Sequence, residues 1–251
     1  FAVSCIATVL SLPKEPSSAE QPNQLFDRSQ VLDQLRPPAH APEFSRVFAA
    51  RTCMMAGVGL TGVFLWYLVR FWVYGKAVVL TSAPLTIPAG FLIAGMAVAT
   101  LIGAALASWA AGPISERIEE KNIPVARVVA GACLLYAAGL ALAWGLGVWS
   151  TGTARENGML LFALISGFAF GVYDSLGLEL VMDSLPDPRR AGHDLGIYAL
   201  ANSAGLALAA IIGALLVNAF EHSFGYYLLF PSAIVMVLLA GIVTLTTKSA
   251  E

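Results

Sequence analysis

The sequence predicts an all-α membrane protein built as a six-helix transmembrane bundle, and three observations lead to this prediction. Of the 251 residues, 58% are hydrophobic and only 12% are charged, about half the charged fraction of an ordinary soluble domain. The apolar residues form long runs rather than the stripes of an amphipathic helix. Lys and Arg gather on one side of these runs. A soluble fold of this composition would lack a polar surface.

Six apolar runs form the larger part of the chain. Each has the roughly 20 residues needed to cross a bilayer, and within such a run only an α-helix satisfies every backbone polar group. The runs lie at about 46–74, 89–111, 125–148, 158–183, 195–218 and 225–246. A six-helix transmembrane domain is therefore predicted over 44–251.

Two segments of different character precede this domain. Residues 1–12 are apolar but too short to span a bilayer, and they lack the basic start and small-residue exit of a signal peptide. We expect them to be the tail of a preceding transmembrane helix. Residues 13–43 are rich in Pro, Ser, Gln and charge, and cannot bury enough apolar surface to fold alone. We expect them to form a cytoplasmic linker.

The distribution of Lys and Arg predicts the orientation of the runs. With the linker in the cytoplasm, only Arg70, Lys76 and Arg155 lie outside. The residues expected inside are Lys14, Arg28, Arg36, Arg46, Arg51, Arg117, Lys121, Arg127, Arg189, Arg190 and Lys248. Both ends of the six-helix domain are therefore expected in the cytoplasm.

Several other classes of function are disfavoured. The net charge of -2 predicts no general attraction to nucleic acid. The three histidines, His40, His193 and His222, are scattered, and the three cysteines have no paired spacing. Neither a metal site nor a cofactor is expected from them, and no catalytic motif is present. The chain is predicted not to be an enzyme.

The segment between the second and third runs, Gly112-Pro-Ile-Ser-Glu-Arg-Ile-Glu-Glu-Lys121, carries a family resemblance. It resembles the G-x-x-S-D-R-x-G-R-R/K signature of the major facilitator superfamily, found in the cytoplasmic loop between the second and third helices of each six-helix half. Glu119 and Glu120 replace the usual glycine and a basic residue. The matching residues are Gly112, Ser115, Glu116, Arg117 and Lys121.

Two further segments resemble the same family. Phe44–Gly57 looks like the opening of the seventh helix in bacterial members, where an arginine on the first turn precedes small residues. The segment from Leu185 to Gly205 resembles the L-P-D…G-x-D-L-G-x-x-x-x-A-N sequence that joins the tenth and eleventh helices in actinobacterial members and sugar–cation symporter-like branches. The order and spacing of the motifs fit the family over Phe44–Glu251.

The resemblance implies the C-terminal six-helix half of a secondary transporter in a bacterial inner membrane. The six runs would be helices seven to twelve, and residues 1–12 the end of helix six. Such transporters bind a small-molecule substrate near mid-membrane, between two halves, and alternate access. The partners implied are this substrate, the lipid bilayer and the missing N-terminal half, with coupling to a proton or a sodium ion. Because the site needs both halves, the isolated chain is expected not to transport.

The resemblance also implies a gating role for Gly112–Lys121. In the family, the acid of the signature pairs with its arginine and with the start of the fifth helix of the half, which here begins near Ala191–Asp194. A carboxylate near a helix N-terminus gains from the macrodipole, so this contact can latch the cytoplasmic side. The alternative is a solvated loop whose charges only set the topology.

Three acids in the fourth run need an explanation, because a carboxylate in hydrocarbon costs several kcal/mol. With entry near Gly158, Asp174 lies about 24 Å along the helix, slightly beyond the bilayer middle. Glu179 lies about 7–8 Å further, and Asp183 lies at the cytoplasmic end. Steps of 100° per residue put Asp174 about 140° from Glu179, so the three acids are not expected to face one cavity.

Asp174 is the main candidate for a substrate or cation pathway, because an intramembrane acid in a transporter usually faces a partner or a water-filled path. Glu179 is a second candidate, with a structural role equally open. Asp183 is expected to form a surface ion pair with the following arginines. The candidate polar groups of the cavity are Tyr173, Ser175, Asn202 and Ser203, with interhelical hydrogen bonding as the alternative.

Two competing functions remain. A non-transporting six-span scaffold or partner subunit would bind another chain through its exposed helix faces. A membrane-embedded enzyme would have only Asp174 and Glu179 as catalytic candidates, and their facing apart argues against it.

Overall fold

The computed structural model describes residues 42–74, 86–149, 152–185, 191–219 and 222–247. These residues belong to one unit of the chain, Pro37–Glu251. The expected helix tail and almost all of the expected linker lie outside the described residues. Every regular element of the described part is helical, as expected for an all-α membrane protein.

The helical elements of the described part alternate with short connections. In chain order they are α3 (Pro42–Gly62), α4 (Leu65–Tyr67), the π-helix η2 (Leu68–Val73), α5 (Thr86–Lys121), α6 (Val125–Trp149), α7 (Thr153–Asp183), α8 (Ala191–Ala219) and α9 (His222–Leu245). By length and composition, the described part has five helices able to cross a membrane, α5 to α9. These five correspond to the second to sixth expected runs.

The first expected run, 46–74, is not one continuous helix. α3 ends at Gly62, and a turn separates it from α4 and η2. The hydroxyl of Thr61 donates to the carbonyl of Val58 at 3.1 Å, a bond that bends helices, and glycine is a poor helix former. Arginines in α3 lower its mean hydropathy, which explains why it is not among the five.

The segment Gly112–Lys121, expected as a loop, is instead the last part of α5. Glu, Arg and Lys are good helix formers, and the helix accommodates Pro113 at the loss of one backbone hydrogen bond. The helix ends at Asn122, whose φ of 49° is left-handed. There the amide of Ile123 donates to the carbonyl of Ile118 at 3.0 Å, which completes a Schellman end. The expected apolar run ends at residue 111, whereas the helix continues to Lys121.

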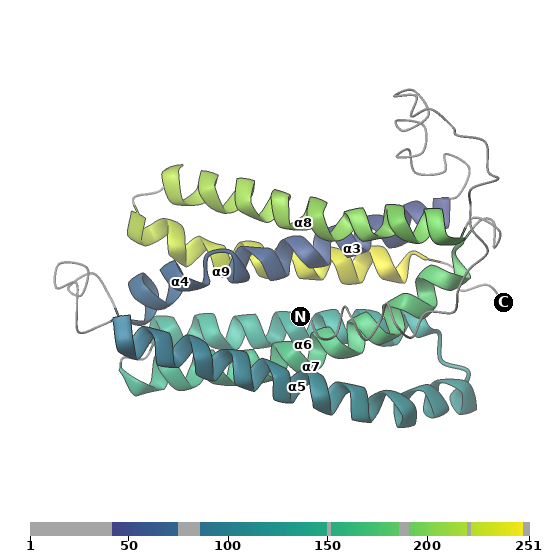
Figure 1. The fold of residues 1–251 in the computed structure, drawn as a ribbon, viewed down its shortest axis with the longest axis horizontal. Coiled ribbons are helices and arrows are strands. Elements are labelled where there is room, and N and C mark those ends of the chain that lie inside the picture. The colour runs from purple at the N-terminus through teal and green to yellow at the C-terminus, as the bar shows by residue number, and fades with distance from the viewer. Residues whose placement is uncertain (1–41, 75–85, 150–151, 186–190, 220–221, 248–251) are drawn as a thin grey trace, which may run out of the picture. The chain divides into compact units, whose positions relative to one another are not determined.

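Figure 1 shows how the long helices pack. α3 packs against α8 and α9, α7 packs against α5 and α6, and α6 and α9 join these two groups. These contacts map onto one another when α3, α5 and α6 are exchanged for α7, α8 and α9, except that α8 contacts α9 whereas α5 and α6 are not in comparable contact. Since each set contains three helices, the second set runs in the opposite direction, which is the arrangement of an inverted repeat. The repeat gives α3 and α7 equivalent places, and they contact each other.

Two glycines allow α5 and α7 to cross at very short distance. A Cβ atom on Gly103 would collide with the carbonyl oxygen of Leu164, and one on Gly167 would collide with the carbonyl oxygen of Thr100. The two backbones are therefore in direct contact, as small residues permit between membrane helices. Gly196 in α8, by contrast, has open space where a Cβ would lie.

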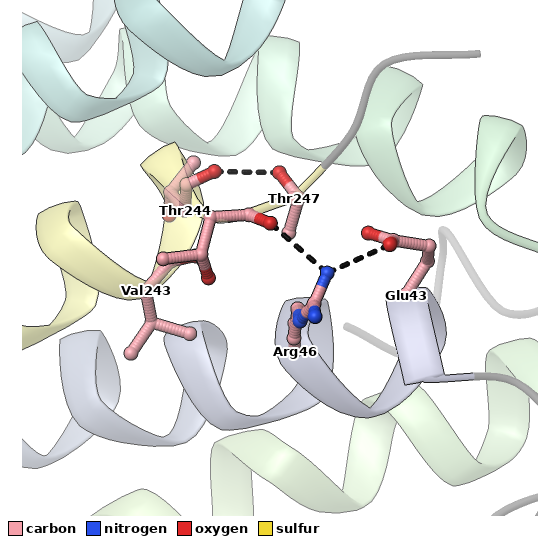
Figure 2. Close-up of polar contacts among 6 residues, drawn as sticks. Glu43, Arg46, Val243, Thr244 and Thr247 are labelled. Carbon is pink, nitrogen blue, oxygen red and sulfur yellow. Dashed lines mark hydrogen bonds and ion pairs between the residues drawn. The ribbon is translucent and has the colours of Figure 1, made fainter.

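Figure 2 shows the end of the bundle at which α3 begins and α9 has just ended. Arg46 Nη1 donates to the carbonyl oxygen of Thr246 at 3.0 Å and pairs with Glu43 Oε1 at 2.7 Å. Next to it, the hydroxyl of Thr247 donates to the carbonyl of Thr244. The last carbonyls of a helix lack intrahelical partners, so Arg46 satisfies one of them from a different helix.

Candidate functional site

Arg51 is a charged residue inside the bundle. It lies on the third turn of α3, and only 7% of the residue is exposed. Arg51 was counted among the basic residues on the cytoplasmic side of the membrane, and the structure shows that its side chain is inside the bundle rather than at the surface. An arginine side chain keeps its proton in proteins, so a buried one requires an anion and hydrogen-bond acceptors around it.

Two polar side chains from two other helices hold this guanidinium. Arg51 Nη1 pairs with Oδ1 of Asp174 on α7 at 2.7 Å. Arg51 Nε donates to Oδ1 of Asn202 on α8, also at 2.7 Å. Both distances are at the short end for N–H···O hydrogen bonds, as expected when a group is charged. Side chains of α7 and α8 thus converge on one positive charge from α3, which is far from both in the sequence.

Three aromatic rings complete the surroundings of Arg51. Its guanidinium carbon lies 5.7 Å from the ring centroid of Phe170, 5.6 Å from that of Tyr173 and 5.8 Å from that of Tyr198. All three distances are within the range of cation–π attraction. Tyr173 is itself buried. We call Arg51, its two polar partners and these three rings the Arg51 cluster.

The Arg51 cluster lies well inside the helices that form it. Arg51 follows Pro42, the first residue of α3, by nine residues, and Asp174 precedes Asp183, the last residue of α7, by nine. At 1.5 Å per residue both lie about 13–14 Å from the same end of the bundle. The hydrocarbon layer is about 30 Å thick, so the ion pair is at membrane depth when this end lies near the boundary.

The ion pair has one closed and one open side. The Arg51 side chain is 9% exposed, whereas that of Asp174 is 55% exposed. Asp174 lies at one edge of the exposed face of α7. The exposed residues of this face, from Asp174 onward, are Asp174, Ser175, Leu178, Glu179, Met182 and Asp183.

Glu179 lies outside the Arg51 cluster. It is exposed at the opposite edge of the same α7 face, and among the described residues it has no ion pair. The expected angle of about 140° between Asp174 and Glu179 falls within one broad exposed face that also holds Asp183, so the three acids share a face, contrary to the expectation from their spacing. The ion pair expected for Asp183 involves Arg189 and Arg190, which lie outside the described residues.

A small cavity adjoins the Arg51 cluster. Its volume is about 10 Å³, and its walls include Tyr173, Tyr198, Thr244 and Thr247. A space of this size holds at most about one water molecule. The cavity brings polar side chains of α7, α8 and α9 together beside Arg51.

The five residues of the signature segment lie at the far end of α5. Glu116, Arg117 and Lys121 are exposed, Ser115 is half-buried, and Gly112 has open space around it. Within the described part, neither Glu116 nor Arg117 forms an ion pair. Figure 1 shows α5 and α8 on opposite sides of the helix group, so the contact implied between this segment and the start of α8 is not made in this conformation.

The comparison with protein families decides the identity of the fold. A family model described as Major Facilitator Superfamily matches residues 96–251, more than half of the chain. The chain belongs to the Major Facilitator Superfamily. This result confirms the resemblance seen in the sequence motifs. No curated protein and no solved structure gave a significant match.

Membership of the Major Facilitator Superfamily makes the chain an integral membrane protein of a transporter family rather than of an enzyme family. The matched range contains α7 and α8, with Asp174 and Asn202, but it begins after α3. Arg51 is therefore identified as a site residue by the structure and not by the family match.

Sequence reasoning missed Arg51, Phe170 and Tyr198. A signal for Arg51 was present, because it lies inside an expected span and would need an acid at similar depth in another span. Asp174 is such an acid. The two rings carried no signal, since aromatic residues are common in transmembrane helices and any of them could face lipid.

Proposed function

We propose that the chain is the C-terminal half of a secondary active transporter, which moves a small solute across the membrane by alternating access. The observation that carries this proposal is the Arg51–Asp174 pair, buried on one side and open on the other, at membrane depth. A charge pair in this place is costly for a purely structural helix bundle, and intramembrane ionisable residues mark substrate and ion pathways.

The open side of the pair is proposed to face a cavity between this half and an N-terminal half. The exposed face of α7 carries three carboxylates, Asp174, Glu179 and Asp183, which makes it unsuited to hydrocarbon. Elsewhere the exposed faces are apolar: on α6, Leu134 is 61% exposed, and on α9, Ile242 is 58% exposed. We infer that lipid covers the apolar faces of α6 and α9, and that water and the partner half cover the acidic face of α7.

The residues of the pathway have distinct proposed roles. Asp174 is the group that couples transport to a proton or a sodium ion. Asn202 and Tyr173 hold Arg51 in place and line the cavity, and Glu179 lies further along the same face toward the end of α7. No tightly bound cofactor is part of this proposal.

The signature segment is proposed to act as a gate in a second conformation. Glu116 and Arg117 would reach the start of α8 when the halves rock and latch the cytoplasmic side. We further propose that both ends of the six-helix domain lie in the cytoplasm and that the membrane is a bacterial inner membrane. An ion pair that forms in one conformation and separates in the other can be made and broken during such motion.

The test is a solute-uptake screen on the full-length transporter in proteoliposomes, with Arg51→Gln and Asp174→Asn as variants. We expect uptake of at least one solute class by the wild type and its loss in Arg51→Gln. The isolated chain is expected to show no flux, because the proposed cavity needs both halves. Flux through the isolated chain, or wild-type uptake in both variants, would refute the proposal.

A further inference from the structure

We propose that the solute is a small monocarboxylate, whose carboxylate replaces that of Asp174 on Arg51 when Asp174 takes up a proton. This inference rests on the proposed function and names the substrate class and coupling ion of the same site. The two partners of the ion pair differ in burial and in their ability to change charge.

Arg51 is the fixed partner. Its side chain is 9% exposed, Asn202 binds its Nε at 2.7 Å, and three aromatic rings surround its guanidinium. It cannot lose its proton, so its charge is permanent. Whenever Asp174 is neutral, a buried cation remains without a counter-ion, which is strongly unfavourable.

Asp174 is the exchangeable partner. Its side chain is 55% exposed, and the ion pair joins Oδ1 alone to Nη1. With water on this face, as proposed above, solvent reaches the carboxylate from the open side of the pair, and a proton can bind there. The same opening gives a solute access to the guanidinium, which still has N–H groups beyond the two that bind Asp174 and Asn202.

The charge of the site selects an anion over a cation. A cationic solute or a sodium ion would have to bind Asp174 within a few ångströms of Arg51, whose like charge repels it. The amide oxygen of Asn202 is already occupied by Arg51. No group of three or more His, Cys, Asp or Glu in the described ranges could hold a metal ion. A carboxylate, however, reproduces what Asp174 offers and can pair with a guanidinium through two parallel hydrogen bonds.

The exchange conserves both atoms and charge. A proton forms an O–H bond with the carboxylate of Asp174, the ion pair opens, and the solute carboxylate pairs with Arg51. One proton and one monoanion then cross together, so no net charge moves. On the other side the solute leaves, the Asp174 O–H bond breaks, and the carboxylate returns to Arg51. No other bond is made or broken.

The other titratable groups near the pair do not change charge in the relevant pH range. They are Tyr173 on α7 and Tyr198 on α8, which lie close to Asp174 and Arg51, and Cys133 on α6, which lies close to Tyr173. Phenols and thiols are ordinarily neutral at and below pH 7. Among the described groups facing the pair, Asp174 is the one carboxylate, so it is the proposed proton acceptor.

The experiment measures binding rather than uptake, because small carboxylic acids also cross lipid bilayers in their neutral form. The full-length protein in detergent would be titrated by calorimetry with acetate, lactate and benzoate between pH 5.5 and 8. The matched controls are acetamide, lactamide and benzamide, which keep the shape and lack the charge. Tetramethylammonium tests for a cation.

We expect at least one acid to bind at pH 5.5 and its amide not to bind. Its apparent affinity should fall about tenfold per pH unit once Asp174 is ionised, because each bound anion requires one bound proton. Asp174→Asn should bind the same acid with no pH dependence, and Arg51→Gln should not bind it. Arg51→Lys keeps the charge and checks that the site, rather than folding, is affected: it should bind more weakly with the same pH slope.

Three results would overturn the inference: no binding of any of the three acids at pH 5.5, equal binding of an acid and its amide, or tetramethylammonium binding that Asp174→Asn abolishes. These failures are distinct from failure of the proposed function. If Arg51→Gln still prevents uptake of some other solute, the transporter and its site stand and only the substrate class is wrong.

Discussion

Arg51 and Arg117 are two arginines that the sequence assigns to the same, cytoplasmic side of the membrane, but their surroundings in the structure differ. Arg51 is 7% exposed and meets an acid, an amide and three aromatic rings from two other helices. Arg117 is exposed at the end of α5 and has no ion pair among the described residues. At the surface, water solvates the charge of an arginine. Inside the bundle, the protein must supply every partner of the guanidinium.

The largest expected effect comes from removing the buried charge. Arg51→Gln should lower transport by the full-length protein about 100-fold, since truncating one partner of a buried charge pair costs about 2–5 kcal/mol. Arg127→Gln, at an exposed basic residue at the start of α6, is the matched control and should stay within about twofold of wild type. Initial uptake rates at equal amounts of protein in the membrane check both. Comparable loss in both variants would mean that burial does not distinguish these arginines.

The second effect separates coupling from movement of the solute. Asp174→Asn should reduce concentrative uptake while sparing counterflow, because the site can still exchange solute but cannot carry the coupling proton. Asp183→Asn, on the same helix at its exposed end, should leave both unchanged. If Asp174→Asn keeps wild-type uptake with an unchanged pH profile, the acid is structural.

The same substitution also has a stability consequence. In Asp174→Asn the buried guanidinium loses its anion, and we expect a loss of about 1–3 kcal/mol in the free energy of unfolding. This is less than the 3–5 kcal/mol typical of a fully buried pair, because solvent already screens the half-exposed carboxylate. Thermal unfolding in detergent measures the change, and a variant as stable as wild type would show that solvent alone neutralises Arg51.

A smaller effect is expected where Arg51 has a neutral partner. Asn202→Ala removes one hydrogen bond to a charged group, worth about 1.5–3 kcal/mol, so transport should fall at least about tenfold. Asn218→Ala lies on the same helix near its other end, is exposed, and should have no effect on the uptake rate. An effect of Asn202→Ala as large as that of Arg51→Gln would show that the amide does more than hold the guanidinium.

The smallest effect belongs to the exposed segment of α5. Glu116→Gln and Arg117→Gln should each change uptake no more than about fivefold, because an ion pair that forms in only one conformation shifts the balance by about 1 kcal/mol or less. Uptake measured at both inside-acid and outside-acid gradients would reveal which conformation is favoured. A loss of uptake near 100-fold would mean that this segment is as important for transport as the Arg51 cluster, and the expected difference between the two arginines would be wrong.

The outline of the fold was predictable because hydrocarbon imposes a simple rule. Long apolar runs must be helical there, so the runs now seen in α5 to α9 could be located from composition alone. The rule fails at helix ends, because a helix can continue into polar residues outside the hydrocarbon and composition then no longer shows where it stops. The continuation of α5 to Lys121 was missed, although Asn122 followed by Pro124 is a recognisable stop signal that would have ended the helix ten residues later than its apolar run.

The candidate site was predictable in its acids and amides but not in its centre. Asp174 attracted attention by its depth, and Asn202 and Tyr173 by their polarity within apolar runs. Arg51 was used only to predict topology, because the positive-inside rule counts arginines near span ends and does not consider which way they face. The separation of 123 residues between Arg51 and Asp174 is bridged only by the packing of α3 beside α7.

The bond from Arg46 to the carbonyl of Thr246 also bears on how this part of the chain could be rearranged. Because it joins the first helix of the described part to the last, the beginning and the end of the six-helix unit lie side by side. Units whose ends meet tolerate circular permutation and insertion into other chains. A chain reordered to start at the short connection between α5 and α6, with a brief peptide joining the old ends, should recover the same helix contacts.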